Sequence, residues 1–189
     1  MNKTLRTALS LQVARRHAQA GVTLIESLMV LAVGTVALGA AAPGFESARE
    51  RRQIESAAAQ FETDVQHARS LAAARSQAVR VTFSSGADNS CYVVHTGDAG
   101  DCPCVADGRP VCSDGAHVLQ TMHWPAATGI RISANVRSMV FEPSRGTITP
   151  AATVKVQGST GSLHQVVNIM GRVRTCTPVN ASLPGYRGC

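Results

Sequence analysis

The feature that most constrains this chain is an apolar run that follows a basic N-terminal segment. Residues 1–21 carry four basic and no acidic side chains, and the run then extends from Val22 to Pro43 with a single charged residue, Glu26. About 20 apolar residues just span the hydrocarbon core of a bilayer, and the basic flank predicts a cytoplasmic N-terminus. A secretory signal peptide is cut after its apolar stretch, whereas here Gly21 precedes the stretch. We therefore predict a leader at 1–21 and a transmembrane segment at 22–43.

Glu26 is out of place in a plain membrane anchor, because an ionised carboxylate without a partner is costly in an apolar environment. If the chain is cut after Gly21, the new α-amino group of Val22 lies about one helical turn from this carboxylate. The amino group of a neighbouring subunit would serve equally well. The position of Glu26 thus favours a processed chain that packs helix against helix.

This arrangement resembles the type IV prepilin family, which has Gly before the cut, a hydrophobic first residue and Glu at the fifth mature position. Val22 stands where that family usually has Phe, and Pro43 stands where it usually has a helix-bending proline. The resemblance implies cleavage by prepilin peptidase, methylation of the new N-terminus, and packing with other pilins and minor pilins in a filament, with Glu26 setting the register. It also implies a single-pass protein of the inner membrane, with its domain in the periplasm or, within a pilus, at the cell surface.

Beyond the apolar run, residues 44–77 are rich in Ala, Glu, Arg and Gln, which favour helix. Apolar residues recur there every three or four positions, so we predict an amphipathic continuation of the helix that covers a sheet. Residues 78–189 then alternate β-branched segments with turn clusters. The predicted strands are 79–84, 91–96, 118–124, 130–133, 138–142, 152–157 and 163–174. The fold class expected is α+β, a long N-terminal helix packed on a β-rich domain of antiparallel sheets.

All six cysteines lie beyond the apolar run, and an even number there is typical of an oxidising compartment. Fifteen pairings are possible, and we predict only Cys176–Cys189, which closes the terminal loop without crossing the acidic segment. Cys102-Pro-Cys104 lacks the two-residue spacer of a zinc knuckle, so we expect disulfides and no metal. The remaining predicted disulfide residues are Cys91, Cys102, Cys104 and Cys112.

The formal net charge of +6 is unevenly distributed. Residues 84–114 hold five Asp and one Arg, whereas residues 115–189 hold seven Lys or Arg and one Glu. A basic region of this kind is typical of a surface that binds a polyanion. A solvated basic face without a ligand is the alternative.

The sequence offers no constellation for catalysis, because it has neither a nucleophile motif nor a phosphate-binding Gly loop. We therefore predict a protein that is not an enzyme and needs no cofactor. Four acidic residues are candidates for a calcium site, but their spacing does not fit an EF-hand loop and favours a solvated acidic loop. These residues are Asp98, Asp101, Asp107 and Asp114.

Two C-terminal motifs resemble the GspH/FimT branch of minor pilins and pseudopilins: the segment Phe141-Glu-Pro-Ser-Arg-Gly146 and the segment 168–176. In FimT-type minor pilins of competent bacteria, a C-terminal Gly-Arg-x-Arg motif is associated with DNA binding, and Gly171-Arg172-Val173-Arg174 matches it. Residues two apart in a strand face the same side, so both guanidinium groups can reach one phosphate backbone. The resemblance implies binding of double-stranded DNA in natural transformation. The basic charge of the C-terminal region predicts Lys155, Arg145 and Arg187 as flanking contacts.

Two other functions fit the same residues. Minor pilins that prime pilus assembly at the tip can carry similar C-termini, and a pseudopilin of type II secretion is a further alternative. In a priming minor pilin the basic face would serve a neighbouring subunit rather than DNA.

Overall fold

A computed structural model describes residues 21–105, 107–113 and 115–189, without the side chains of residues 41–43. The chain forms two compact units, residues 1–42 and 43–189, which are described separately. The helix α1 (Leu24–Arg75) contributes to both units. Residues 1–20 of the predicted leader 1–21 lie outside the described residues.

In the first unit, α1 presents large apolar side chains to its surroundings on every side, and Leu24 and Val36 are 79% and 74% exposed. Such side chains have nothing to pack against within the described part of this unit. Among the described residues, no helical segment taken singly is long and apolar enough to cross a membrane. The two parts of α1 on either side of residues 41–43, Leu24–Ala40 and Gly44–Arg75, meet that criterion together.

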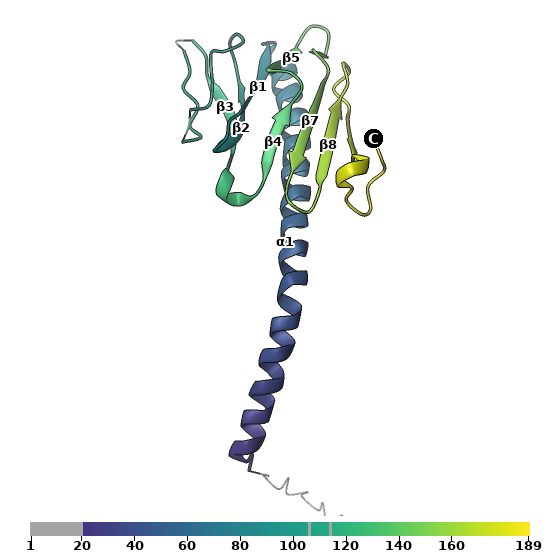
Figure 1. Cartoon of the computed structure of the whole chain (residues 1–189). Coiled ribbons are helices and arrows are strands. Elements are labelled where there is room, and N and C mark those ends of the chain that lie inside the picture. The colour runs from purple at the N-terminus through teal and green to yellow at the C-terminus, as the bar shows by residue number, and fades with distance from the viewer. Residues whose placement is uncertain (1–20, 106, 114) are drawn as a thin grey trace, which may run out of the picture. The chain divides into compact units, whose positions relative to one another are not determined.

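In the second unit, one face of α1 is buried against two sheets, and α1 lies behind the strands in Figure 1. The predicted apolar stripe is confirmed, since the core includes Ile54, Phe61, Val65 and Ala68, each at most 1% exposed. The helix ends at Arg75, two residues before the predicted boundary, where Gln77 N–H donates to the carbonyl of Ala72 at 3.2 Å.

The first sheet has the strand order β3-β2-β1-β5-β6, and all its pairs are antiparallel. Phe61 of α1 packs edge-on against Tyr92 of this sheet, with ring centroids 5.4 Å apart. The short β6 was not expected from the sequence. The strands are β1 (Val79–Ser85), β2 (Asn89–His95), β3 (Val118–Pro125), β5 (Ser138–Glu142) and β6 (Thr147–Thr149).

The second sheet has the order β4-β7-β8-β9 and is also antiparallel. Its inner face carries buried residues at every second position, such as Val154 and Val156 of β7. The α+β fold, with a long helix on antiparallel sheets, is thus confirmed. The strands are β4 (Arg131–Ala134), β7 (Ala152–Gln157), β8 (Ser162–Val167) and β9 (Val173–Cys176), and short 3₁₀ helices follow β3 (η1, Ala126–Thr128) and β9 (η2, Val179–Ala181).

The prediction of a single strand over 163–174 is wrong. The chain turns back at residues 168–172, so the segment forms the antiparallel hairpin β8–β9, with Val166 opposite Arg174. Gly171 has φ of +76°, which glycine adopts without steric cost. Arg172 therefore belongs to the hairpin loop, and only Arg174 lies within a strand.

Three disulfides cross-link the second unit: Cys91–Cys104, Cys102–Cys112 and Cys176–Cys189. The pair expected from the sequence, Cys176–Cys189, is among them. The other two hold the long acidic segment between β2 and β3, where Cys102 packs on Val93 and Ala116 in a small second core.

Candidate functional site

The β8–β9 loop is fixed by a local hydrogen-bond network centred on Asn168. Its side-chain oxygen accepts from the N–H groups of Met170 and Arg172 at 3.0 and 2.9 Å. Its backbone N–H donates to the carbonyl of Arg172 at 3.1 Å, and its carbonyl accepts from Gly171 N–H at 2.9 Å. The network holds the backbone of Arg172 in one place.

Gly171 packs tightly against α1. A Cβ atom built on Gly171 would lie 3.3 Å from Cδ of Arg69 and 3.3 Å from Cδ1 of Ile148. The Gly171 carbonyl accepts a hydrogen bond from the side-chain amide of Gln66 at 3.2 Å. The glycine therefore supplies both the positive φ and the room that lets the loop rest on the helix.

Arg172 and Arg174 are both exposed and line one shallow hollow of about 410 Å³, together with Val166 and Asn168. Val173 between them points inward and packs on the core. The salt bridges among the described residues are Arg51–Glu55 and Arg109–Asp107, so neither guanidinium of the pair has an acidic partner there. Two unpaired cations thus border one concave surface.

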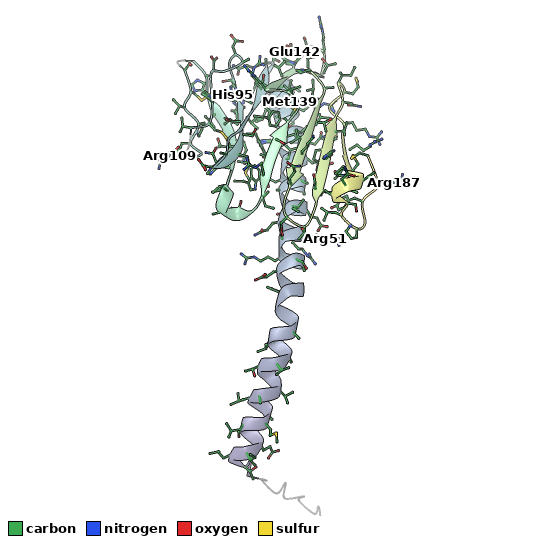
Figure 2. The ribbon with its side chains drawn as sticks, in the orientation of Figure 1. Arg51, His95, Arg109, Met139, Glu142 and Arg187 are labelled. Atoms are coloured by element: carbon green, nitrogen blue, oxygen red, sulfur yellow. A yellow bond between two sulfur atoms is a disulfide. The ribbon has the colours of Figure 1, made fainter. Side chains whose placement is uncertain are left out.

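Lys155 lies on the outer face of the second sheet, and Arg187 lies on the C-terminal segment beside the end of β9. Lys155 of β7 is exposed and stands opposite His164, which stands opposite Cys176 of β9. Arg187 is exposed, its carbonyl accepts a hydrogen bond from the N–H of Thr177 at 2.9 Å, and Figure 2 shows it on the C-terminal segment. Burial, and to a smaller extent the nearby Lys155, lowers the pKa of His164. The outer face, its hairpin loop and the adjoining C-terminal segment together carry four exposed basic side chains, Lys155, Arg172, Arg174 and Arg187.

Arg145 is placed differently from the other predicted contacts. It is exposed in the turn between β5 and β6, which belongs to the first sheet. No hydrogen bond or salt bridge among the described residues joins it to Arg172 or Arg174. The expected flanking role of Arg145 thus has less structural basis than those of Lys155 and Arg187.

Sequence reasoning missed two participants in this region. Arg69 lies on α1, about 100 positions before the motif in the sequence, and only the fold brings it to Gly171. The turn-forming role of Asn168 was hidden by its apolar neighbours Ile169 and Met170, which read as part of a strand. The Asn and Gly three residues apart were the one local signal of a turn.

The predicted N-terminal site lies at the start of the described residues. Thr23 precedes α1, and its hydroxyl accepts a hydrogen bond from the N–H of Glu26 at 3.4 Å. Val22 is 71% exposed, and the Glu26 side chain makes no salt bridge within the described part of the chain. The local geometry is that of a helix start with an acidic first turn, a favourable position for a negative charge.

The acidic segment does not gather its carboxylates into a cation site. Asp101 accepts a hydrogen bond from the N–H of Asp98 at 2.7 Å, and Asp107 lies 3.7 Å from Arg109. Across the described residues, no cluster of three or more potential metal ligands occurs. Asp114, the fourth residue considered, lies outside the described residues.

Two protein families match the sequence. The family described as "Type II transport protein GspH" matches residues 57–171, and the "Prokaryotic N-terminal methylation motif" matches residues 16–42. The first match ends at Gly171, so it does not extend to Arg172 and Arg174. No curated protein matches the chain.

Among solved structures, the type IV minor pilin FimU of Pseudomonas aeruginosa is similar, with 18% identity and a TM-score of 0.50 over 72% of this chain and 96% of that chain. The minor pseudopilin EpsH of the Vibrio cholerae type 2 secretion system matches at 12% identity and a TM-score of 0.43, over 66% of this chain and 97% of that chain. The likeness to FimU supports the fold.

Pilins and pseudopilins are structural subunits, and an N-terminal methylation motif on an apolar helix fits a membrane-anchored protein associated with a pilus. The chain belongs to the GspH/FimT family of type IV pilin-like proteins.

Proposed function

We propose that this protein is a minor type IV pilin that binds double-stranded DNA without sequence preference through Gly171, Arg172 and Arg174, and that it serves DNA uptake in natural transformation. One observation carries the proposal. Arg172 and Arg174 are exposed side by side on the outer face of the second sheet, without an acidic partner among the described residues.

The chemistry of this face suits a phosphate backbone. A guanidinium group can donate two parallel hydrogen bonds to one phosphate. Lys155 on the same face and Arg187 on the adjoining C-terminal segment add positive charge nearby, and this charge does not distinguish one base sequence from another. Contacts of this kind are independent of sequence and weaken as salt rises.

The membrane and filament part of the proposal rests on the N-terminal residues. Prepilin peptidase cuts after Gly21, so that the mature chain begins at Val22 and spans the inner membrane once, with the disulfide-bonded domain in the periplasm. Glu26 then pairs with the amino group of Val22 in its own or a neighbouring chain and sets the register among other pilins. The exposed apolar surface of α1 supports this environment, because it is covered by lipid before assembly and by neighbouring helices afterwards.

A test of processing is mass spectrometry of membrane fractions. The mature chain should begin at Val22, and Gly21→Glu should block the cut. A mature N-terminus elsewhere, in a host with active prepilin peptidase, would contradict this part of the proposal.

A second candidate is a subunit that primes a pilus tip or a type II secretion pseudopilus without binding DNA. The description of the matching family as a type II transport protein favours it. The basic face would then contact an acidic neighbouring subunit. Gene neighbourhood separates the systems, since pilus and competence genes favour the first function and secretion genes favour the second.

The test of DNA binding is a gel shift with residues 49–189, which keep the whole core, the three disulfides and Glu50, whose carboxylate accepts hydrogen bonds from Ser159 and Thr160. This domain should shift duplexes of unrelated sequence equally. Replacing Arg172 and Arg174 with Gln should weaken the shift, and cells with both changes should make pili but transform poorly. Undiminished binding and transformation would favour the priming subunit.

A further inference from the structure

The tip of the β8–β9 loop exposes two large apolar side chains next to each other. Ile169 and Met170 are 58% and 56% exposed. Neither contributes to the described core. Adjacent exposed apolar residues at a protruding turn mark a contact surface more often than solitary ones do.

The backbone beneath these side chains is fixed. The carbonyl of Ile169 accepts a hydrogen bond from Ile148 N–H of β6 at 2.8 Å, and the N–H of Met170 donates to Asn168. A contact made by this tip would order little additional chain, so little binding energy would be lost to entropy.

Arginines flank the tip on two sides. On one side Arg69 of α1 lies against Gly171, with its Nε 3.6 Å from a Cβ built there. On the other side Arg172 points to the outer face of the second sheet. Glu142 lines the same hollow as Arg69, but the two form no salt bridge among the described residues. The tip is thus apolar in the middle and cationic on both flanks.

We propose that the Ile169–Met170 tip contacts a groove of the DNA duplex, while Arg69 and Arg172 bind phosphates on either side of it. A groove has this complementary pattern, since phosphates line its walls and sugars, base edges and thymine methyl groups form its interior. The inference rests on the proposed DNA binding and adds two features to it: an apolar contact that is independent of salt, and a third arginine from α1.

The two features have different signatures in a salt titration of residues 49–189 with a fluorescein-labelled duplex of mixed sequence. Replacing Ile169 and Met170 with Ser should weaken binding by about tenfold at every salt concentration and leave the slope unchanged, because apolar contacts release no counterions. Replacing Arg69 with Gln should flatten the slope by about one unit. The change Met170→Gln keeps side-chain length and serves as a milder second variant.

Matched controls come from the same domain. Val179→Ser removes an apolar side chain that is 90% exposed on η2, and Arg52→Gln removes an exposed arginine of α1 about 25 Å along the helix from Arg69. Both should bind as the wild type does. Thermal unfolding of each variant checks the fold.

The outcomes separate the two proposals. If the tip variants bind DNA as the wild type does, while Arg172→Gln with Arg174→Gln weakens binding, the groove contact is wrong, the DNA-binding proposal survives, and the tip belongs to a contact with another subunit. If the wild-type domain does not bind DNA, both proposals fail.

Discussion

Two irregular segments of the second unit carry opposite charge and are held in place by different means. The segment 97–115 is acidic, and the disulfides Cys91–Cys104 and Cys102–Cys112 fasten it to β2 and to itself. The loop 168–172 is basic, and hydrogen bonds from one asparagine and close packing on α1 hold it. A covalent link can order a segment with almost no core, whereas the basic loop depends on its fit to the rest of the fold. Disturbing one segment should therefore leave the other intact.

The largest effect should follow from removing the Cys102–Cys112 disulfide by replacing both residues with Ser. The free energy of unfolding should fall by about 2–4 kcal/mol, because the unfolded chain loses a constraint and the small core around Cys102 loses a member. Urea unfolding of residues 49–189 measures this. DNA affinity should be unchanged, and a parallel loss of affinity would show that the two segments are coupled.

A smaller effect should follow from Asn168→Ala. The N–H groups of Met170 and Arg172 lose their acceptor, which should lower the free energy of unfolding by about 1 kcal/mol. DNA affinity should fall several-fold, since Arg172 loses one of the two hydrogen bonds that join its backbone to Asn168. Asn168→Asp keeps the acceptor and should restore the stability, as urea unfolding would measure. Equal stability of the wild type and the alanine variant would argue that the loop is held by packing alone.

The smallest effect concerns pH at the base of the acidic segment. His95 is fully buried, with its ring nitrogens 2.8 Å from the hydroxyl of Thr82 and 2.9 Å from the carbonyl of Thr96. Burial has the largest influence on His95 and lowers its pKa. The hydrogen bond to Thr96 raises the pKa by less, the nearby Arg80 lowers it, Asp101 raises it, and the net shift is downward. The unfolded chain then binds the proton more readily than the folded chain does.

The sign follows from this difference. The contribution of the neutral His95 to the free energy of unfolding is fully present above about pH 6.5, the pKa of histidine in the unfolded chain. This contribution should decline as the pH falls from there through the lower pKa of His95 in the folded chain. Urea midpoints measured between neutral and mildly acidic pH should fall more steeply for the wild type than for His95→Gln. Parallel profiles would contradict a neutral buried imidazole.

The sequence predicted much of this fold because its strongest signals are periodic and local. The apolar spacing of Ile54, Phe61 and Val65 indicated the buried face of α1, and β-branched segments indicated most strands. The turn at 168–172 was missed, since Ile169 and Met170 continue the apolar pattern of a strand and only tertiary contacts show that they are exposed. Two of the three disulfide pairings cannot be derived from the sequence, because many pairings fit the same spacing.

The candidate site was predicted in part for the same reason. The spacing of Arg172 and Arg174 is a local property, and both are exposed on one face. Their relation to Lys155 depends on strand order, and that of Arg69 to Gly171 depends on how α1 crosses the sheets. Neither can be derived from spacing along the chain.

The most direct test of the central claim is the salt dependence of DNA binding by the wild-type domain and by two variants of equal charge. One variant replaces Arg172 and Arg174 with Gln, and the other replaces the exposed Arg52 and Arg109 with Gln. Each neutralised phosphate contributes about 0.9 to the slope of log affinity against log salt. We predict that the first variant flattens the slope by up to about two units between about 50 and 200 mM salt, while the second keeps the wild-type slope. Equal slopes for the two variants would contradict the claim, because net charge rather than the Arg172–Arg174 pair would then govern binding.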